Sequence, residues 1–380
     1  MIKVICLSFL LSFSLISVGQ INKFKKIDLH SKSISGRLND ISSISQKLTK
    51  GLNNDYEKAR AIYIWVAHNI KYDYRNRNQG VSYFDEQEIV DKTLRRRVGV
   101  CFHYSLLFES LCKSAGIEVY KIGGYTYQSN KVNDRIGHMW NLVIIDSKPF
   151  FVDVTWASGY EMDGKYYNQF RDEYFLIPPE IFIKTHMPLD PLFQMLQRPI
   201  SHKEFYNRDF SALSKQKKNY QMQIDSLRQF SKLEPLDFYE SEIKRIEKAG
   251  IPNIITRDWL VSLQGQVVTV KLNLSVDLIN ESVKEYNNYI NAKNNQFRKM
   301  SDEEVSFLLN KASMNINKAQ ELLSDVEIYE EDRESRRSFK ETANKVFKVR
   351  ESIEKEKAFL SVYLKRSGKS RKMLFYKRVN

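Results

Sequence analysis

Cys101, His138 and Asp153 are the residues whose types could together carry out nucleophilic chemistry. A cysteine attacks as a thiolate, so it needs a base that takes up its proton and later returns it. The base in turn needs a carboxylate that fixes its tautomer and stabilises its protonated form. In chain order, the three residues supply a nucleophile, a base and an orienting group. The elements that carry them decide whether they meet.

The segment from Val100 to Ala115 is predicted to be a helix with Cys101 at its N-terminus. Its apolar residues recur at helical spacing, and Gly116 provides a C-terminal stop. Cys101 directly follows a stretch that contains the basic run 95–97. The helix dipole and the nearby cations both favour a thiolate at such a place. A cysteine there is nevertheless more often structural than catalytic when it stands alone.

Residues 137–145 and 150–156 are predicted to form the two strands of a β-hairpin. Both runs are rich in β-branched and aromatic residues, and residues 146–149 between them are typical of a turn. His138 and Asp153 are an odd number of positions apart, so with an even-length loop their side chains face the same side of the hairpin. The two side chains are therefore expected to be able to meet.

The cysteines are not expected to form a disulfide. Helical geometry puts Cys101 and Cys112 about 16 Å apart, whereas the Cα atoms of bridged cysteines lie within about 7 Å of each other. Cys112 is interpreted as a small core residue. The third cysteine, Cys6, lies in the N-terminal apolar run. So few cysteines exclude a disulfide scaffold and a Cys-rich zinc module.

The N-terminus has the organisation of a secretory signal peptide. A short basic start at residues 1–3 precedes an apolar run, and the small residues Ser17 and Gly19 are typical of a cleavage site. Cleavage after Gly19 would remove residues 1–19 and export the chain to the periplasm, the envelope or the medium. The alternatives are a membrane anchor or a buried helix, although the apolar run is shorter than the roughly 20 residues of a membrane span.

The composition of the 380-residue chain excludes two broad classes of protein. Hydrophobic residues make up 42% and aromatic residues 12%, which is enough for a buried core and two domains and excludes a disordered chain. The mean hydropathy of −0.47 excludes a multi-span membrane protein. The formal charge of +14 suits an anionic surface, but nucleic acid is not expected as a partner because exported proteins rarely meet it. No HExxH or CxxC spacing is present, so neither a metal nor a cofactor is predicted.

Three runs that contain these candidate residues resemble the motifs of the transglutaminase-like superfamily: Arg-Val-Gly-Val-Cys at 97–101, Gly-His-Met-Trp-Asn at 137–141 and Val-Asp-Val-Thr-Trp at 152–156. Flanking runs are similar to that family as well: 61–66, 69–73, 174–180, 185–188 and 194–196. The downstream runs resemble the kyphoscoliosis-peptidase-type branch. The resemblance covers about residues 50–206, and with the N-terminus it points to an exported, bacterial-type protein whose transglutaminase-like domain spans residues 51–206.

The resemblance implies an α+β, papain-like core in which the helix of Cys101 packs against an antiparallel sheet that carries His138 and Asp153. It also implies an acyl-enzyme mechanism. Cys101 would attack a glutamine side-chain or peptide carbonyl, His138 would act as base and then acid, and Asp153 would orient His138. Transfer to an amine gives a crosslink, and transfer to water gives deamidation or proteolysis. The backbone N–H of Cys101 is a candidate oxyanion donor, because a helix N-terminus presents free N–H groups.

Five residues are candidates for the lining of a substrate cleft: Trp65, Phe102, His103, Trp140 and Trp156. Phe102 and His103 stand where the family often has a small or acidic residue and then glycine, which reshapes the approach to the cysteine. His103 is interpreted as structural or substrate-facing, and not as the base. The tryptophans fit the hydrophobic core at least as well, because aromatic side chains beside such strands are more often buried.

The second half of the chain, residues 207–364, is predicted to be an all-α helical domain. Gly and Pro become rare there, and apolar residues recur at spacings of three and four, as they do from Trp259 onward. A capping box at Ser301 predicts a helix to about Leu323, and another helix is predicted from Glu330 to Leu364. This domain is interpreted either as a bundle that binds a protein partner or as a stabilising appendage. Residues 20–50 are assigned to an N-terminal extension.

Residues 365–380 form a basic tail with seven Lys or Arg and no acid. The tail is interpreted as unstructured, or alternatively as a segment that lies on an anionic membrane or envelope polymer. Three functions thus remain open for the whole chain. It is an exported cysteine acyltransferase or protease with a protein or peptide substrate, a catalytically silent transglutaminase-like domain that binds a protein, or an envelope-associated scaffold.

Overall fold

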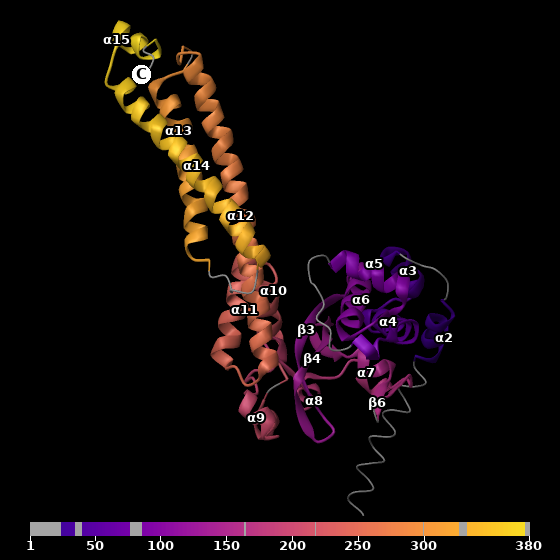
Figure 1. Cartoon of the computed structure of the whole chain (residues 1–380). Helices are drawn as coiled ribbons and strands as arrows, with labels where there is room; N and C mark the ends of the chain where they lie inside the picture. The colour runs from indigo at the N-terminus through magenta and orange to yellow at the C-terminus, as the bar shows by residue number, and fades with distance from the viewer. Residues whose placement is uncertain are drawn as a thin grey trace, which may run out of the picture. The chain divides into compact units, whose positions relative to one another are not determined.

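The computed structural model describes residues 24–34, 40–76, 86–162, 165–216, 218–298, 300–326 and 333–376. They form two compact units within the chain drawn in Figure 1. The first unit runs to Lys232 and includes Lys244–Trp259, and the second comprises Leu233–Ile243 and the residues from Leu260 onward. The chain first passes from one unit to the other after Lys232, which lies beyond residue 206, the predicted end of the transglutaminase-like domain. The predicted signal peptide lies outside the described residues.

A four-stranded antiparallel sheet lies in the first unit. Its strands are β3 (Glu118–Gln128), β4 (Lys131–Ile145), β5 (Lys148–Val152) and β8 (His186–Pro188), and they lie in the order β5-β4-β3-β8. The β4–β5 pair is the predicted hairpin, and it turns through two residues in the left-handed region, Asp146 and Ser147. An antiparallel sheet beside helices confirms the predicted α+β class.

The second strand of the hairpin is shorter than predicted. It ends at Val152, and a short helix, α7 (Val154–Ser158), replaces the strand expected as far as Trp156. The cause is Asp153, whose Oδ1 accepts a hydrogen bond of 2.9 Å from the backbone N–H of Trp156 and so caps the helix. This cap outweighs the strand preference of the β-branched and aromatic residues at positions 154–156.

The helix α6 (Cys101–Ser114) matches the predicted helix and contacts both β3 and β4. Leu107, Phe108 and Leu111 are fully buried on its apolar face, as the spacing predicted. Gly116, which follows the helix, has a φ of +78°, in the left-handed conformation that glycine adopts at helix ends. The predicted core arrangement of a helix packed on an antiparallel sheet is therefore confirmed.

Two hydrogen bonds fasten α6 to the strand β4. The Ser105 hydroxyl donates to the carbonyl oxygen of Trp140 at 3.0 Å, and the Asn141 side chain donates to the carbonyl oxygen of Ser105 at 3.1 Å. All three residues are buried. These bonds hold α6, one turn after Cys101, against the residues of β4 that follow His138. They therefore fix the helix of Cys101 relative to the strand of His138.

The predicted N-terminal extension contributes to the same unit. It holds α2 (Lys25–Ser33) and α3 (Ile41–Thr49), which both contact α4 (Asp55–Asn69). Arg60 of α4 is almost completely buried and makes ion pairs with Asp28 of α2 and with Asp172. A buried guanidinium must keep its carboxylate partners, so this cluster fastens the extension to the core.

The other elements between α4 and α12 are β1 (Lys71–Tyr72), η1 (Tyr74–Asn76), α5 (Glu86–Arg96), β2 (Val98–Gly99), β6 (Tyr160–Met162), β7 (Lys165–Tyr167), η2 (Asp172–Tyr174), α8 (Pro179–Phe182), η3 (Pro191–Gln194), α9 (His202–Tyr206), η4 (Ser211–Lys215), α10 (Gln221–Phe230) and α11 (Pro235–Ala249).

Gly124 on β3 allows the close approach of β8, because a Cβ there would lie 2.3 Å from the carbonyl oxygen of Met187. That close approach brings the strand of His186 into the sheet.

The second unit is helical, as predicted. It contains most of α12 (Ile254–Asn294), together with α13 (Asp302–Ser324) and α14 (Arg333–Leu364). Ser301 and Glu304 form the predicted capping box at the start of α13. A separate hydrophobic core holds these helices together, and among the described residues no helix combines the length and apolar character needed to cross a membrane.

The first part of the predicted basic tail is folded. It forms α15 (Gly368–Lys372) and η5 (Met373–Phe375). Arg371 donates to both carboxylate oxygens of Asp302, at 3.0 and 2.7 Å, and the Phe375 ring lies 5.7 Å from the ring of Phe359. The interpretation of an unstructured tail is therefore wrong for residues 368–375, because an ion pair and aromatic packing hold them on the helical unit.

Candidate active site

Cys101 is the first residue of α6, and its side chain is partly exposed. The preceding Val100 has an extended backbone, so the chain turns directly from β2 into the helix. The parallel pairing of β2 with β1 holds this approach in place. The cysteine thus lies where the first N–H groups of a helix have no partner within the helix and where the dipole favours negative charge.

His103 caps the helix that carries the nucleophile. Its Nδ1 accepts a hydrogen bond of 3.2 Å from the backbone N–H of Val100, so its proton resides on Nε2. This position of the ring requires glycine at Gly99, where an added Cβ would lie 2.4 Å from the Cβ of His103. Burial lowers the pKa of His103, which keeps the ring a neutral acceptor. The structural interpretation of His103 therefore fits this geometry.

His138 and Asp153 meet as predicted. His138 is 9% exposed on β4, and Asp153 is fully buried between β5 and α7. The His138 Nε2 lies 2.6 Å from Asp153 Oδ2. The strand register places Asn141 opposite Val152, so Asp153, which directly follows β5, lies next to β4. The parity argument from sequence thus gave the right contact, although Asp153 lies just beyond the strand.

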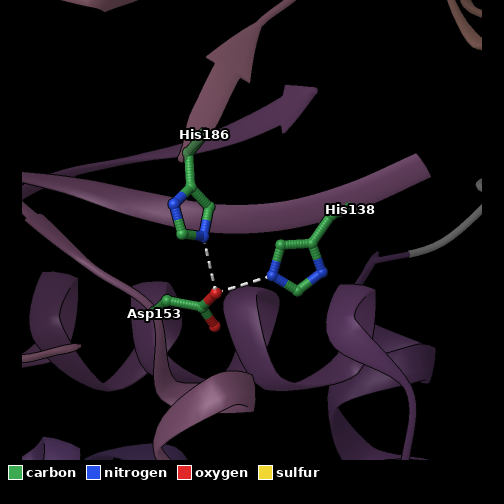
Figure 2. Close-up of side chains that lie close together, drawn as sticks. All are labelled: His138, Asp153 and His186. Atoms are coloured by element: carbon green, nitrogen blue, oxygen red, sulfur yellow. Dashed lines mark hydrogen bonds and ion pairs between the residues drawn. The ribbon is translucent and has the colours of Figure 1, made fainter. Parts of the chain in front are cut away.

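Asp153 is the centre of a network that includes one residue missed from sequence. His186 of β8 also directs its Nε2 at Asp153 Oδ2, at 3.1 Å (Figure 2). The other carboxylate oxygen is held by the backbone N–H of Trp156. Three residues, His138, Trp156 and His186, therefore donate to one buried carboxylate. The run that contains His186 belonged to the family resemblance, but its spacing gave no sign of a contact with Asp153.

The electrostatics of the network favour a charged pair. Burial lowers the pKa of His138, but the charge and hydrogen bond of Asp153, together with a hydrogen bond from Cys101, overcome it and raise the pKa to about 10. Burial raises the pKa of Asp153, yet both histidines lower it well below the usual range of a carboxylic acid. At neutral pH, Asp153 is therefore an anion and His138 is an imidazolium.

The second nitrogen of His138 is left for Cys101. Nε2 is engaged by Asp153, and Figure 2 shows Nδ1 on the side of the ring that points away from the carboxylate. Cys101 is among the groups that raise the pKa of this ring, and Nδ1 is the ring nitrogen left available to its thiol. The structure thus brings together the three residues that the sequence predicted, in the order thiol, imidazole, carboxylate.

Of the five cleft candidates, only Trp156 and His103 expose part of their side chains. The Trp156 ring stacks on His138, with centroids 5.3 Å apart and an interplanar angle of 28°. Trp65, Phe102 and Trp140 are only 1–2% exposed. We therefore correct their assignment from cleft lining to core, since side chains this deeply buried offer no surface to a substrate. The alternative that these tryptophans are core residues holds for two of the three.

The atoms that surround Asp153 are also of types that bind zinc. The ligand atoms of His138, Asp153 and His186 all lie within 4.8 Å of one another. However, both imidazoles direct the same type of nitrogen at one oxygen, at 2.6 and 3.1 Å, which are ordinary hydrogen-bond distances. Protons account for both contacts, and each imidazole has a further partner on its Nδ1 side. The network is complete as a set of hydrogen bonds.

Comparison with known proteins agrees with this geometry. Residues 42–156 match the family model of the transglutaminase-like superfamily. The chain contains a transglutaminase-like core. The matched segment runs from α3 to α7, so it includes the cysteine helix, the histidine strand and Asp153. His186 lies beyond it.

Individual relatives share this part of the chain. Kyphoscoliosis peptidase of Homo sapiens is 29% identical over 195 residues, which are 49% of this chain and 29% of that protein. Lim and transglutaminase domain protein ltd-1 of Caenorhabditis elegans is 28% identical over 190 residues, or 44% of this chain and 25% of that protein. The chain therefore spans under a third of the length of these relatives.

A solved structure described as a TGase is similar over 44% of this chain and 41% of its own, with 16% sequence identity and a TM-score of 0.23. This overlap is too weak to bear on function.

Proposed function

We propose that the protein is a cysteine acyltransferase or protease that acts through Cys101, His138 and Asp153 on glutamine side-chain or peptide carbonyls. The observation that carries the proposal is the position of His138, between the Asp153 carboxylate on its Nε2 side and Cys101 on its other side. A thiol, an imidazole and a carboxylate in this order are the minimum set for nucleophilic catalysis by cysteine. The transglutaminase-like core supports the same reaction class.

The reaction begins from the state in which the proton of the Cys101 thiol has already passed to His138 Nδ1, because His138 is an imidazolium at neutral pH. The thiolate sulfur then forms a bond to the carbonyl carbon, and the electron pair of the C=O double bond moves to the oxygen. When this tetrahedral intermediate collapses, the C–N bond breaks and His138 returns its proton to the departing nitrogen. Ammonia leaves from a glutamine side chain, or an amine leaves from a peptide. The product of this half-reaction is a thioester on Cys101.

The second half-reaction repeats these steps with a new nucleophile. His138 removes a proton from water or from an amine, whose oxygen or nitrogen attacks the thioester, and the thiolate leaves. Water gives deamidation or proteolysis, and an amine gives a crosslink. Throughout, Asp153 keeps the proton of His138 on Nε2, so that Nδ1 always faces the reacting atoms. The N–H groups at the start of α6 are the candidate donors to the oxyanion.

We also propose that the chain is exported, on the basis of the basic, apolar and small-residue order of residues 1–19. N-terminal sequencing of the protein from its native host tests this directly. A mature chain that begins after Gly19 is expected, and an intact Met1 would contradict the proposal.

Iodoacetamide alkylation of Cys101 as a function of pH tests the proposed pair before any substrate is known. An ordinary thiol reacts with a midpoint near pH 8.5. We expect labelling of Cys101 to persist well below pH 7, and we expect the His138→Ala variant to lose this labelling at acid pH. Peptide mapping separates Cys101 from Cys112, which is fully buried and serves as an internal control.

Activity is then measured as incorporation of a fluorescent primary amine into a glutamine-rich protein, and as cleavage or deamidation of the same protein. The Cys101→Ala variant is expected to abolish all three while it leaves the circular dichroism spectrum unchanged. If Cys101 reacts like an ordinary thiol whether or not His138 is present, the catalytic proposal fails. A catalytically silent binding domain is then the better description.

A further inference from the structure

His186 occupies a position that the proposed three-residue mechanism does not require. It comes from β8, the edge strand next to β3, and it is fully buried. Its Nε2 reaches the same oxygen of Asp153 that His138 uses. A carboxylate oxygen has two lone pairs, so it can accept both hydrogen bonds at once. Asp153 is therefore oriented from two sides.

The proton on His186 can be placed from its neighbours. The Thr185 hydroxyl lies 2.8 Å from His186 Nδ1 and 3.3 Å from its other acceptor, the carbonyl oxygen of Phe182. The ionised Asp153 carboxylate can only accept, so His186 Nε2 carries the proton and donates it to Asp153. In the neutral ring Nδ1 is then an acceptor for the nearby Thr185 hydroxyl. A neutral imidazole makes both contacts.

The surroundings of His186 keep it neutral. Phe182 of α8 stacks on it with ring centroids 3.9 Å apart, and the rings of Trp156 and Trp140 lie at 4.5 and 5.1 Å. The titratable groups that act on it are Asp153 and His138. Burial lowers the pKa of His186 to about 4, because it outweighs the Asp153 carboxylate, and the charge of His138 lowers it further. His186 therefore does not compete with His138 for the positive charge.

We propose that His186 is a positioning residue for the proposed reaction, which holds the Asp153 carboxylate ionised and aimed at His138. The proposal rests on the proposed function of the same site. The neutral N–H of His186 stabilises the Asp153 anion, and this anion in turn stabilises the imidazolium of His138. Without that donor, Asp153 takes up a proton at a higher pH, and the support for the protonated form of His138 is lost with it.

Two substitutions separate this role from packing. His186→Phe keeps a planar ring among the aromatic neighbours but removes the donor to Asp153. His186→Gln keeps an N–H donor at nearly the same distance along the side chain but removes the ring. If His186 only fills space, the Phe variant resembles the native protein and the Gln variant is impaired. If His186 positions Asp153, the order is reversed.

The readout is the pH profile of iodoacetamide alkylation at Cys101 in the full chain, with thermal melting as a check on folding. In His186→Phe we expect the acid limb to move to higher pH by at most about one to two pH units, because that is the full shift that loss of one hydrogen bond imposes on the Asp153 carboxylate. In His186→Gln we expect the limb to remain near its native position. His202→Phe is the matched control, because His202 is a buried histidine that contacts Tyr125 outside the site.

The outcomes separate this proposal from the one on which it rests. If His138→Ala removes the acid limb but His186→Phe leaves it unchanged, the pair exists and the role of His186 is refuted. A shift of equal size in His202→Phe would refute it as well, since the effect would then reflect general loosening. If no variant changes the profile and Cys101 behaves as an ordinary thiol, the proposed function itself fails.

Discussion

Replacement of Asp153 by asparagine keeps the shape of the side chain and removes its charge. In the native protein, Asp153 Oδ1 accepts a hydrogen bond from the backbone N–H of Trp156, and Oδ2 accepts hydrogen bonds from the Nε2 atoms of His138 and His186. Asparagine has one oxygen, and the helix cap at Trp156 is its best use because a backbone donor cannot reverse its role. The amide NH₂ group then faces the two imidazoles, so that donors meet donors.

The expected consequence is a change of tautomer at His138. Its Nε2 must become an acceptor, which moves the proton to Nδ1, the atom that has to take the proton of Cys101. The pKa of His138 also falls from about 10 to 6.5 or below, because burial remains while the carboxylate is gone. The imidazolium fraction at pH 7 drops from nearly all to about a quarter or less. Trapping the base in the wrong tautomer costs about 10⁴-fold in kcat in serine protease triads.

The assay combines the pH titration of the His138 ring by NMR with the alkylation profile of Cys101. Asp190→Asn is the matched control, because Asp190 is a buried aspartate that pairs with Arg245 outside the site. We expect the titration midpoint of His138 to fall by three pH units or more in Asp153→Asn and to stay unchanged in the control. A His138 that still titrates near pH 10 without the carboxylate would refute the reasoning.

Four further predictions concern stability and the surface. His186 has a pKa of about 4 in the folded protein and binds a proton more readily in the unfolded chain. Its contribution to the free energy of unfolding therefore falls as pH drops from 6.5 to 4. Urea melts of His186→Phe should show a weaker decline of the free energy of unfolding over this pH range. Leu111→Ala should destabilise the protein by about 2–5 kcal/mol, measured by urea unfolding, because Leu111 is fully buried, and a loss below 1 kcal/mol would contradict this packing. Ser301→Ala should cost about 1 kcal/mol through loss of the cap on α13, measured by thermal melting, with Ser301→Asp as the variant that preserves it. Lys365 and Lys369 are exposed near the folded tail, and their joint replacement by Glu should weaken cosedimentation with anionic vesicles; equal binding by both proteins would remove this surface as a candidate.

Much of the core was predictable because local patterns govern it. The apolar spacing and Gly116 gave the helix that begins at Cys101, since helix periodicity and a left-handed stop are properties of a short stretch of chain. The turn residues and the parity of positions gave the contact between His138 and Asp153. The end of strand β5 at Val152 was not predicted, because a capping hydrogen bond of one side chain outweighed the strand preference of its neighbours.

The sequence alone therefore determined the chemical types of the site, the helix that presents the thiol and the hairpin that joins imidazole to carboxylate. The tertiary structure decided which aromatic side chains are buried and that His186 shares the carboxylate. β8 follows the hairpin only after several short elements, from α7 to α8, and it pairs with β3 in an antiparallel register that no short-range pattern encodes. Packing of distant segments around one buried charge brought that histidine to Asp153, and the energy of such packing depends on the whole fold rather than on the neighbours of any residue in sequence.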